Sequence, residues 1–117
     1  MVGLADVLRG LSAREGVQAA LLLSGEGLPI EHAASGPFEP ETVAALAATL
    51  AQYATRLGDG TGRGSLQTAV LEFESGPVVL SRASSEDWLA VLARPGTDIG
   101  PLLYDLRHHH PALAALL

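Results

Sequence analysis

Apolar residues along the chain recur at two kinds of spacing, and each kind predicts a different element. Spacing of three and four residues predicts helices over residues 2–14, 41–57 and, after a cap at Thr97 or Asp98, up to about His110. Short runs that are continuously apolar or alternate with polar residues predict strands over residues 17–23, 28–33, 66–74, 77–83 and 88–93. The predicted order is α-β-β-α-β-β-β-α, which is an α+β fold.

The predicted middle helix, residues 41–57, carries no formal charge between Glu41 and Arg56, unlike a helix on the surface of a monomer. One side has an apolar stripe that we expect to pack on the core: Val43, Leu46, Ala47, Leu50, Ala54 and Leu57. The other sides hold small or uncharged residues: Ala44, Ala45, Ala48, Thr49, Ala51, Gln52 and Thr55. Because a helix that is apolar nearly all round is buried nearly all round, we expect a second copy or a partner protein to cover it. The alternative is that alanine, the best helix former, fills solvent positions.

The predicted strands differ in how their faces are covered. Residues 17–23 are almost continuously apolar, so both faces should be covered, and residues 88–93 carry no charge, which favours a central strand. Residues 66–74 alternate, and this strand begins a meander of three. Its two faces hold Ala69, Leu71 and Phe73 on one side and Thr68, Val70 and Glu72 on the other.

Glycines and prolines predict where the helices end. Gly58 is expected to stop the middle helix, and Pro111 is expected to kink or end the last helix near His110. The glycine-rich segment 58–65, GDGTGRGS, follows a helix, precedes a strand and has no lysine. A phosphate loop requires the opposite order and a lysine, so the segment is interpreted as a flexible connection.

Composition favours one globular domain over residues 1–117. Hydrophobic residues make up 48% of the chain, which excludes disorder. Charged residues make up only 17%, where about 25% is usual, and this deficit favours a buried interface. The net charge of -6 argues against nucleic acid as a partner, because binding to phosphates needs a basic surface.

No feature of the sequence predicts export or a membrane span. The chain has no cysteine, and its first residues have Asp6 inside an apolar run and no basic leader. No uninterrupted apolar run approaches the ~20 residues of a transmembrane helix. We therefore expect a cytoplasmic protein without a membrane span.

Candidate catalytic and metal-binding residues are few. His108, His109 and His110 are adjacent, so on a helix they point about 100° apart and at most two could bind one ion. Glu72 and Glu74 point to one side of their strand about 7 Å apart, but such charges also protect a strand edge from aggregation. No serine lies in a nucleophile elbow. We therefore predict no enzyme activity, no metal and no cofactor.

Four segments, in their order and spacing, resemble the roadblock/dynein light chain family, and the resemblance covers about residues 3–110. They are GVQAALLLSGEGLPIEHA (16–33), the alanine-rich middle helix, SGPVVLSRASSEDWLAVLA (75–93) and TDIGPLLYDLR (97–107). The resemblance implies a profilin-like five-stranded antiparallel sheet, with the middle helix on one face and the two terminal helices on the other.

The resemblance also implies a homodimer that forms through strand 66–74 and helix 41–57. The expected dimer or partner interface comprises Ala45, Ala48, Thr49, Gln52, Tyr53, Thr55, Arg56, Thr68, Val70 and Glu72. Members of the family are non-catalytic regulators or scaffolds, and the bacterial, MglB-like ones act on small Ras-like GTPases. The resemblance therefore implies a small GTPase as a partner. The alternative is a small-ligand-binding sensor domain or a scaffold subunit without a GTPase partner.

Overall fold

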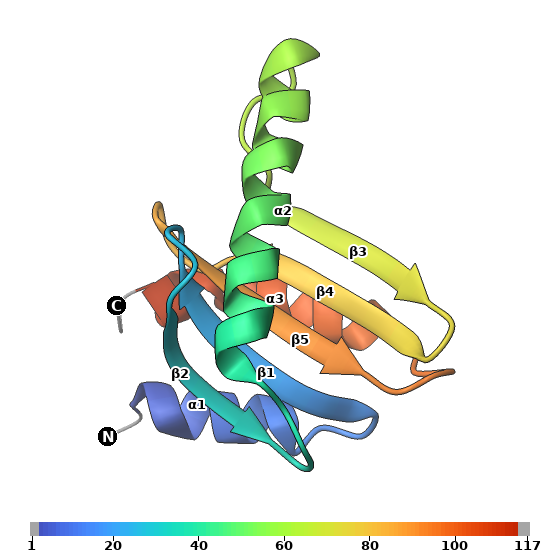
Figure 1. The fold of residues 1–117 in the computed structure, drawn as a ribbon. Coiled ribbons are helices and arrows are strands. Elements are labelled where there is room, and N and C mark those ends of the chain that lie inside the picture. Colours follow the sequence, from blue (N-terminus) through green and yellow to red (C-terminus); the bar gives the residue numbers. More distant parts are fainter. Residues whose placement is uncertain (1–2, 115–117) are drawn as a thin grey trace.

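The computed structural model describes the backbone of residues 3–114 and the side chains of residues 3–108. The order of elements is the predicted one, α-β-β-α-β-β-β-α (Figure 1). The elements are α1 (Leu4–Ser12), β1 (Val17–Ser24), β2 (Pro29–Ala34), α2 (Pro40–Gly60), β3 (Thr68–Phe73), β4 (Gly76–Arg82), β5 (Asp87–Ala93) and α3 (Gly100–Ala114).

The strands form one antiparallel sheet in the order β2-β1-β5-β4-β3. Strand β5 lies at the centre, as its lack of internal charge predicted, and strand β1 pairs on both of its edges. Strands β2 and β3 lie at the two ends of the sheet, so each has one edge without a neighbouring strand in the described chain. The predicted meander of β3, β4 and β5 is confirmed.

Helices cover both faces of the sheet and create two separate cores (Figure 1). Leu8 of α1 and Leu102 and Leu106 of α3 pack against one face. Helix α2 lies alone across the other face, where it packs on Leu21, Leu23, Leu80, Trp88 and Ala90. The last turns of α2 project beyond the sheet (Figure 1). This arrangement confirms the predicted layers, with the middle helix on one face and the terminal helices on the other.

The prediction that Gly58 stops the middle helix is wrong, because helix α2 continues to Gly60. Gly58 serves a different purpose, because the loop that follows the helix folds back onto it. A Cβ on Gly58 would lie 2.3 Å from the carbonyl oxygen of Gly64, and the Arg63 N–H donates to the Gly58 carbonyl at 2.8 Å. The missing side chain therefore permits a close approach of two backbones rather than a helix end.

Helix α3 runs to Ala114, so the expectation that Pro111 ends it near His110 is wrong. Proline lacks the N–H that would bond to the carbonyl four residues back, so the helix continues past Pro111 with one backbone hydrogen bond fewer. The side chains of His109 and His110, and residues 115–117, lie outside the described residues.

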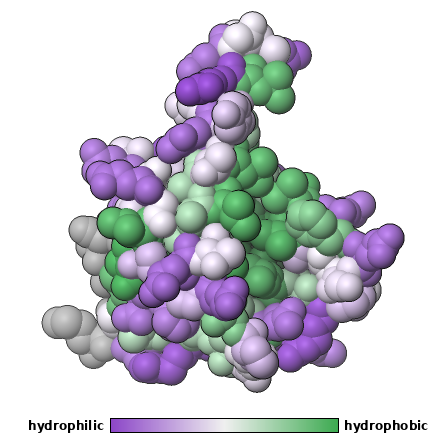
Figure 2. Space-filling model, in the orientation of Figure 1, coloured by the Kyte–Doolittle hydropathy of each residue, from purple (hydrophilic) through white to green (hydrophobic). Residues whose placement is uncertain are grey.

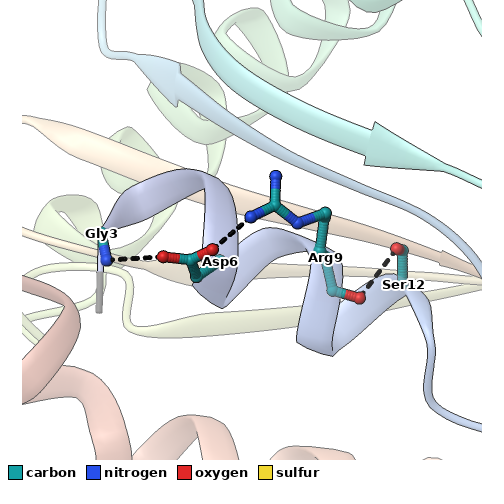
Figure 3. Close-up of polar contacts among 4 residues, drawn as sticks. All are labelled: Gly3, Asp6, Arg9 and Ser12. Atoms are coloured by element: carbon teal, nitrogen blue, oxygen red, sulfur yellow. Dashed lines mark hydrogen bonds and ion pairs between the residues drawn. The ribbon is translucent and has the colours of Figure 1, made fainter. Parts of the chain in front are cut away.

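The first turns of α1 are held by a short polar chain (Figure 3). The backbone N–H of Gly3 donates to the Asp6 carboxylate at 3.1 Å, Arg9 forms an ion pair with the same carboxylate, and the Ser12 hydroxyl donates to the Arg9 carbonyl at 3.0 Å. The hydrogen bond from Gly3, followed by the charge of Arg9, lowers the pKa of Asp6 below its ordinary value. The exposed carboxylate thus stabilises the positive end of the helix.

Candidate functional site

The side of α2 that faces the sheet is centred on alanines, so the predicted core stripe is only partly right: Val43, Ala47 and Leu50 do pack against this core, at its margin. Ala44, Ala48 and Ala51 are buried in the core, and Ala48 keeps only 3% of its surface exposed. The predicted core stripe is instead open to solvent at Leu46 and Leu57, which are 66% and 69% exposed. The helix therefore packs through its smallest side chains and leaves large apolar ones uncovered.

The turn between β1 and β2 explains why only small side chains fit beneath α2. A Cβ on Gly27 of this turn would lie 3.3 Å from the Cα of Ala45 and 3.5 Å from the Cβ of Ala48. Gly27 also has a φ of 92°, which L side chains rarely adopt. The large side chains of this core come from the sheet, so the helix can approach closely only with alanines.

The exposed leucines form a regular stripe along α2. Residues 46, 50, 53 and 57 follow one another at spacings of four, three and four, so they lie on one side of the helix. Tyr53 in this stripe is 63% exposed, and Leu50 is half-buried against the core. Three large apolar side chains in one exposed row are unusual for a helix of a monomer.

Strand β3 provides a free edge beside this stripe. The Arg82 N–H donates to the Gln67 carbonyl at 2.9 Å, which fixes the positions that bond to β4. Since bonded positions alternate along an antiparallel strand, residues 69, 71 and 73 bond to β4. The backbone groups that point to the open edge therefore belong to Thr68, Val70 and Glu72.

The side chains of β3 extend the apolar area of α2. Ala69 packs on the core beneath α2, so by alternation Leu71 and Phe73 point to the same face of the sheet. Phe73 is 60% exposed. We define the α2–β3 surface as Leu46, Leu50, Tyr53, Leu57, Leu71 and Phe73 with the free edge of β3. Figure 2 shows a hydrophobic area on this side of α2, over the sheet.

The other open edge of the sheet, β2, is less available for pairing. Its first residue is Pro29, which has no N–H to donate. The N–H of His32 points outward but donates to the carboxylate of its neighbour Glu31 at 3.2 Å. Proline and charged residues on an edge discourage the addition of another strand. Of the two edges, β3 is the one suited to accept a partner.

The predicted interface residues fall into four groups in the structure. Ala45, Thr49, Gln52 and Arg56 lie exposed on the flank of α2 away from β3, and Thr55 is half-buried next to them. Tyr53 belongs to the α2–β3 surface. Thr68, Val70 and Glu72 provide the free backbone edge, although their side chains point to the face of the terminal helices. The prediction that Ala48 lies at an interface is wrong, because Ala48 is buried inside the chain's own core.

The sequence pattern did not identify Leu46 and Leu57 as exposed residues, because large apolar side chains on a helix were assigned to the core. A usable signal was present: the helix holds leucines and Tyr53 on one side and alanines on another. The flank with Gln52 and Arg56 lines a shallow groove of about 620 Å³ between the β1–β2 and β4–β5 turns. The Arg56 guanidinium also lies 5.2 Å from the centre of the Tyr53 ring.

Among the described residues, no group of three or more histidine, cysteine or acidic side chains could hold a metal ion. The ring of His108 stacks on that of Tyr104 with 3.9 Å between the ring centres, and its Nδ1 lies 2.9 Å from the Tyr104 carbonyl oxygen. Both contacts of this imidazole are therefore made within α3. No helix within residues 3–114 is long and apolar enough to cross a membrane.

The structure is therefore a three-layer α+β fold in which an exposed apolar stripe lies beside a free strand edge. The chain belongs to the Roadblock/LC7 domain family, whose sequence profile matches residues 4–93. The predicted family is thereby confirmed. None of the curated proteins compared with this chain matches it.

Solved structures of the family superpose on nearly the whole chain. A Roadblock/LC7 domain from Streptomyces avermitilis is 29% identical, with a TM-score of 0.86 over 96% of this chain and 95% of that one. The gliding protein MglB from Thermus thermophilus is 22% identical, with a TM-score of 0.85 over 99% and 93%. Profilin II of Acanthamoeba castellanii is 15% identical, with a TM-score of 0.60 over 86% of each chain. The profilin-like fold is confirmed.

Proposed function

We propose that this protein is a non-catalytic homodimeric module that binds or regulates a small Ras-like GTPase. The observation that carries the proposal is the α2–β3 surface, where an apolar stripe and a free strand edge lie side by side on one face. A second copy can satisfy both at once, because its own strand edge extends the sheet and its own stripe covers the leucines.

The exposed side chains make such a contact favourable. Leu46, Tyr53 and Leu57 are each more than 60% exposed, and Phe73 is 60% exposed. Full burial of one large apolar side chain contributes roughly 1.5–3 kcal/mol. In a two-fold symmetric contact each residue is buried twice, once on each subunit. The apolar part of the surface can therefore supply much of the free energy that a stable dimer needs.

The GTPase partner is inferred from membership of the Roadblock/LC7 family and its MglB-like neighbours. The groove beside Gln52 and Arg56 supports this inference, because it lies on the flank of α2 that a dimer formed through β3 would leave open. We assign the partner to this flank. It contains both charged and apolar side chains, including Glu26, Glu86 and Trp88, as transient protein interfaces commonly do.

Two measurements test the two parts of the proposal separately. Light scattering at micromolar concentration should give twice the monomer mass of 12.1 kDa. Leu46→Glu should shift the mass towards the monomer, whereas Gln52→Arg, which fills the groove on the other flank, should leave it unchanged. A parent protein that stays at 12.1 kDa would contradict the homodimer.

The second measurement is binding to the small Ras-like GTPases of the same organism, loaded with GDP or a non-hydrolysable GTP analogue. We expect one of them to bind in a nucleotide-dependent manner, with the binding lost in Gln52→Arg. The protein alone should not hydrolyse GTP. A dimer that binds none of these GTPases in either nucleotide state would leave the homodimer standing and contradict the GTPase role.

A further inference from the structure

A groove lies at the end of the sheet where β3 begins. It has a volume of about 750 Å³, and its walls come from the end of α2, the loop 61–67, the first residues of β3, the last of β4 and helix α3. Leu57 and Leu66 provide an apolar wall. Three arginines, Arg63, Arg82 and Arg107, line it, and no acidic residue does so among the described residues.

The positive charge of this groove contrasts with the rest of the chain. The whole protein has a net charge of -6 and only seven arginines and lysines. Three of these seven line one groove that has no carboxylate among its described residues, so the groove is positively charged on a negatively charged protein. Arg82 is fixed in place. Its Nε donates to the Leu66 carbonyl at 2.9 Å, and its guanidinium lies 4.3 Å from the centre of the Trp88 ring. Arg63 and Arg107 are exposed at the rim.

The opposite end of the same strand is acidic. Glu72 lies near the end of β3 and Glu74 just beyond it, and both side chains are exposed. The described residues form ion pairs between Arg9 and Asp6 and between Arg14 and Asp105, and neither glutamate takes part in one. Strand β3 thus runs from an arginine-lined start to a carboxylate-bearing end.

A two-fold axis perpendicular to the sheet would bring these two ends together. Such an axis keeps both α2 helices on one face and makes the two copies of β3 antiparallel. In an antiparallel pair, the end of each strand lies against the start of the other. We propose that the arginine groove receives Glu72 and Glu74 of the partner subunit, an inference that rests on the proposed homodimer.

The faces of the strand select Arg107 as the main contact. The side chain of Glu72 points to the face of the terminal helices, as those of Thr68 and Val70 do. On that face, Arg107 of α3 lines the groove together with Thr68 and Ser81. Because of the two-fold symmetry, the ion pair between Arg107 and the partner's Glu72 forms twice in the dimer. Parallel pairing would instead place the two acidic ends side by side, so the charges favour antiparallel pairing.

The dissociation constant of the dimer tests this contact, measured by sedimentation or by fluorescence dilution. Arg107→Glu should raise it roughly tenfold, because two pairs are lost and the new carboxylates face glutamates. Glu72→Arg with Glu74→Arg should weaken the dimer similarly. The triple variant that carries all three changes should restore the parent value. Arg9→Glu, which makes the same charge change on α1, should leave the constant unchanged.

Salt gives an independent readout. Raising the ionic strength should weaken the parent dimer and strengthen the Arg107→Glu dimer, because screening removes attraction in one and repulsion in the other. A parent dimer whose constant is unaffected by Arg107→Glu would overturn the ion pairs while leaving the dimer in place. A monomeric parent would overturn both. Binding of inorganic phosphate that is lost in Arg107→Glu, with the dimer unchanged, would show an anion site instead and would also overturn the proposal.

Discussion

The orientation of α2 predicts that two nearby substitutions affect different properties, one the stability of the subunit and the other the stability of the dimer. Ala48→Glu places a carboxylate in the core beneath the helix, where Ala48 is 3% exposed and packs near Leu21, Leu23 and Trp88. Leu46→Glu, two residues earlier, places the same group on a side chain that is 66% exposed. Only the first change buries an unpaired charge in the folded subunit.

The expected difference is large. A buried carboxylate without a partner, in a space sized for a methyl group, costs about 3–5 kcal/mol, against a total stability of about 5–15 kcal/mol. At this chain length each kcal/mol lowers the melting temperature by roughly 4 °C, so Ala48→Glu should melt about 12–20 °C below the parent. Leu46→Glu should change subunit stability by about 0.5 kcal/mol or less while weakening the dimer.

Urea unfolding followed by the fluorescence of the single tryptophan measures this difference directly, since Trp88 lies in the same core as Ala48. Dimerisation itself adds stability that depends on concentration, so the comparison belongs at low protein concentration. If Ala48→Glu were as stable as the parent and Leu46→Glu unfolded the subunit, the assignment of the two sides of α2 would be wrong.

Two further predictions concern stability. Gly58→Ala should lower the free energy of unfolding, measured with urea, by about 1–3 kcal/mol, because its Cβ would lie 2.3 Å from the Gly64 carbonyl oxygen. Gly60→Ala, with nothing within 4 Å of its Cβ, should be neutral or stabilising, and equal effects of the two changes would contradict the close approach at Gly58. The lowered pKa of Asp6 makes its contribution to stability fully present above the unfolded pKa of about 3.9, and this contribution is lost as the pH falls through the folded pKa. Asp6→Asn should therefore destabilise the protein at pH 7 and leave it unchanged near pH 2, and an equal effect at both would contradict this role.

The spacing of apolar residues was sufficient to predict the elements and their order. The uncharged run of β5 predicted its central place, because only a strand with neighbours on both edges and helices on both faces can dispense with polar residues. The layers followed from the family resemblance. Helix ends were less predictable: Gly58 permits a close backbone contact with Gly64 rather than ending the helix, and this contact depends on where the loop 61–65 returns in space.

The side of α2 that faces the core could not be predicted from the sequence by the usual rule. That rule assigns the largest apolar side chains to the interior. Here the sheet already supplies Leu21, Leu80 and Trp88, and the Gly27 turn leaves room only for alanines. The absence of charge on the helix predicted that it needs a second cover, but not which side needs it. Which side of α2 faces the core depends on how much room the side chains of the sheet leave beneath the helix.

Amide hydrogen exchange tests, residue by residue, whether the free edge of β3 binds a second copy of the chain. The N–H groups of Thr68, Val70 and Glu72 point outward, whereas those of residues 69 and 71 bond to β4 within the subunit. At high protein concentration all five should be protected. On dilution below the dissociation constant, only the three outward amides should lose protection. Rapid exchange of Thr68, Val70 and Glu72 at every concentration, with 69 and 71 still protected, would contradict pairing at this edge.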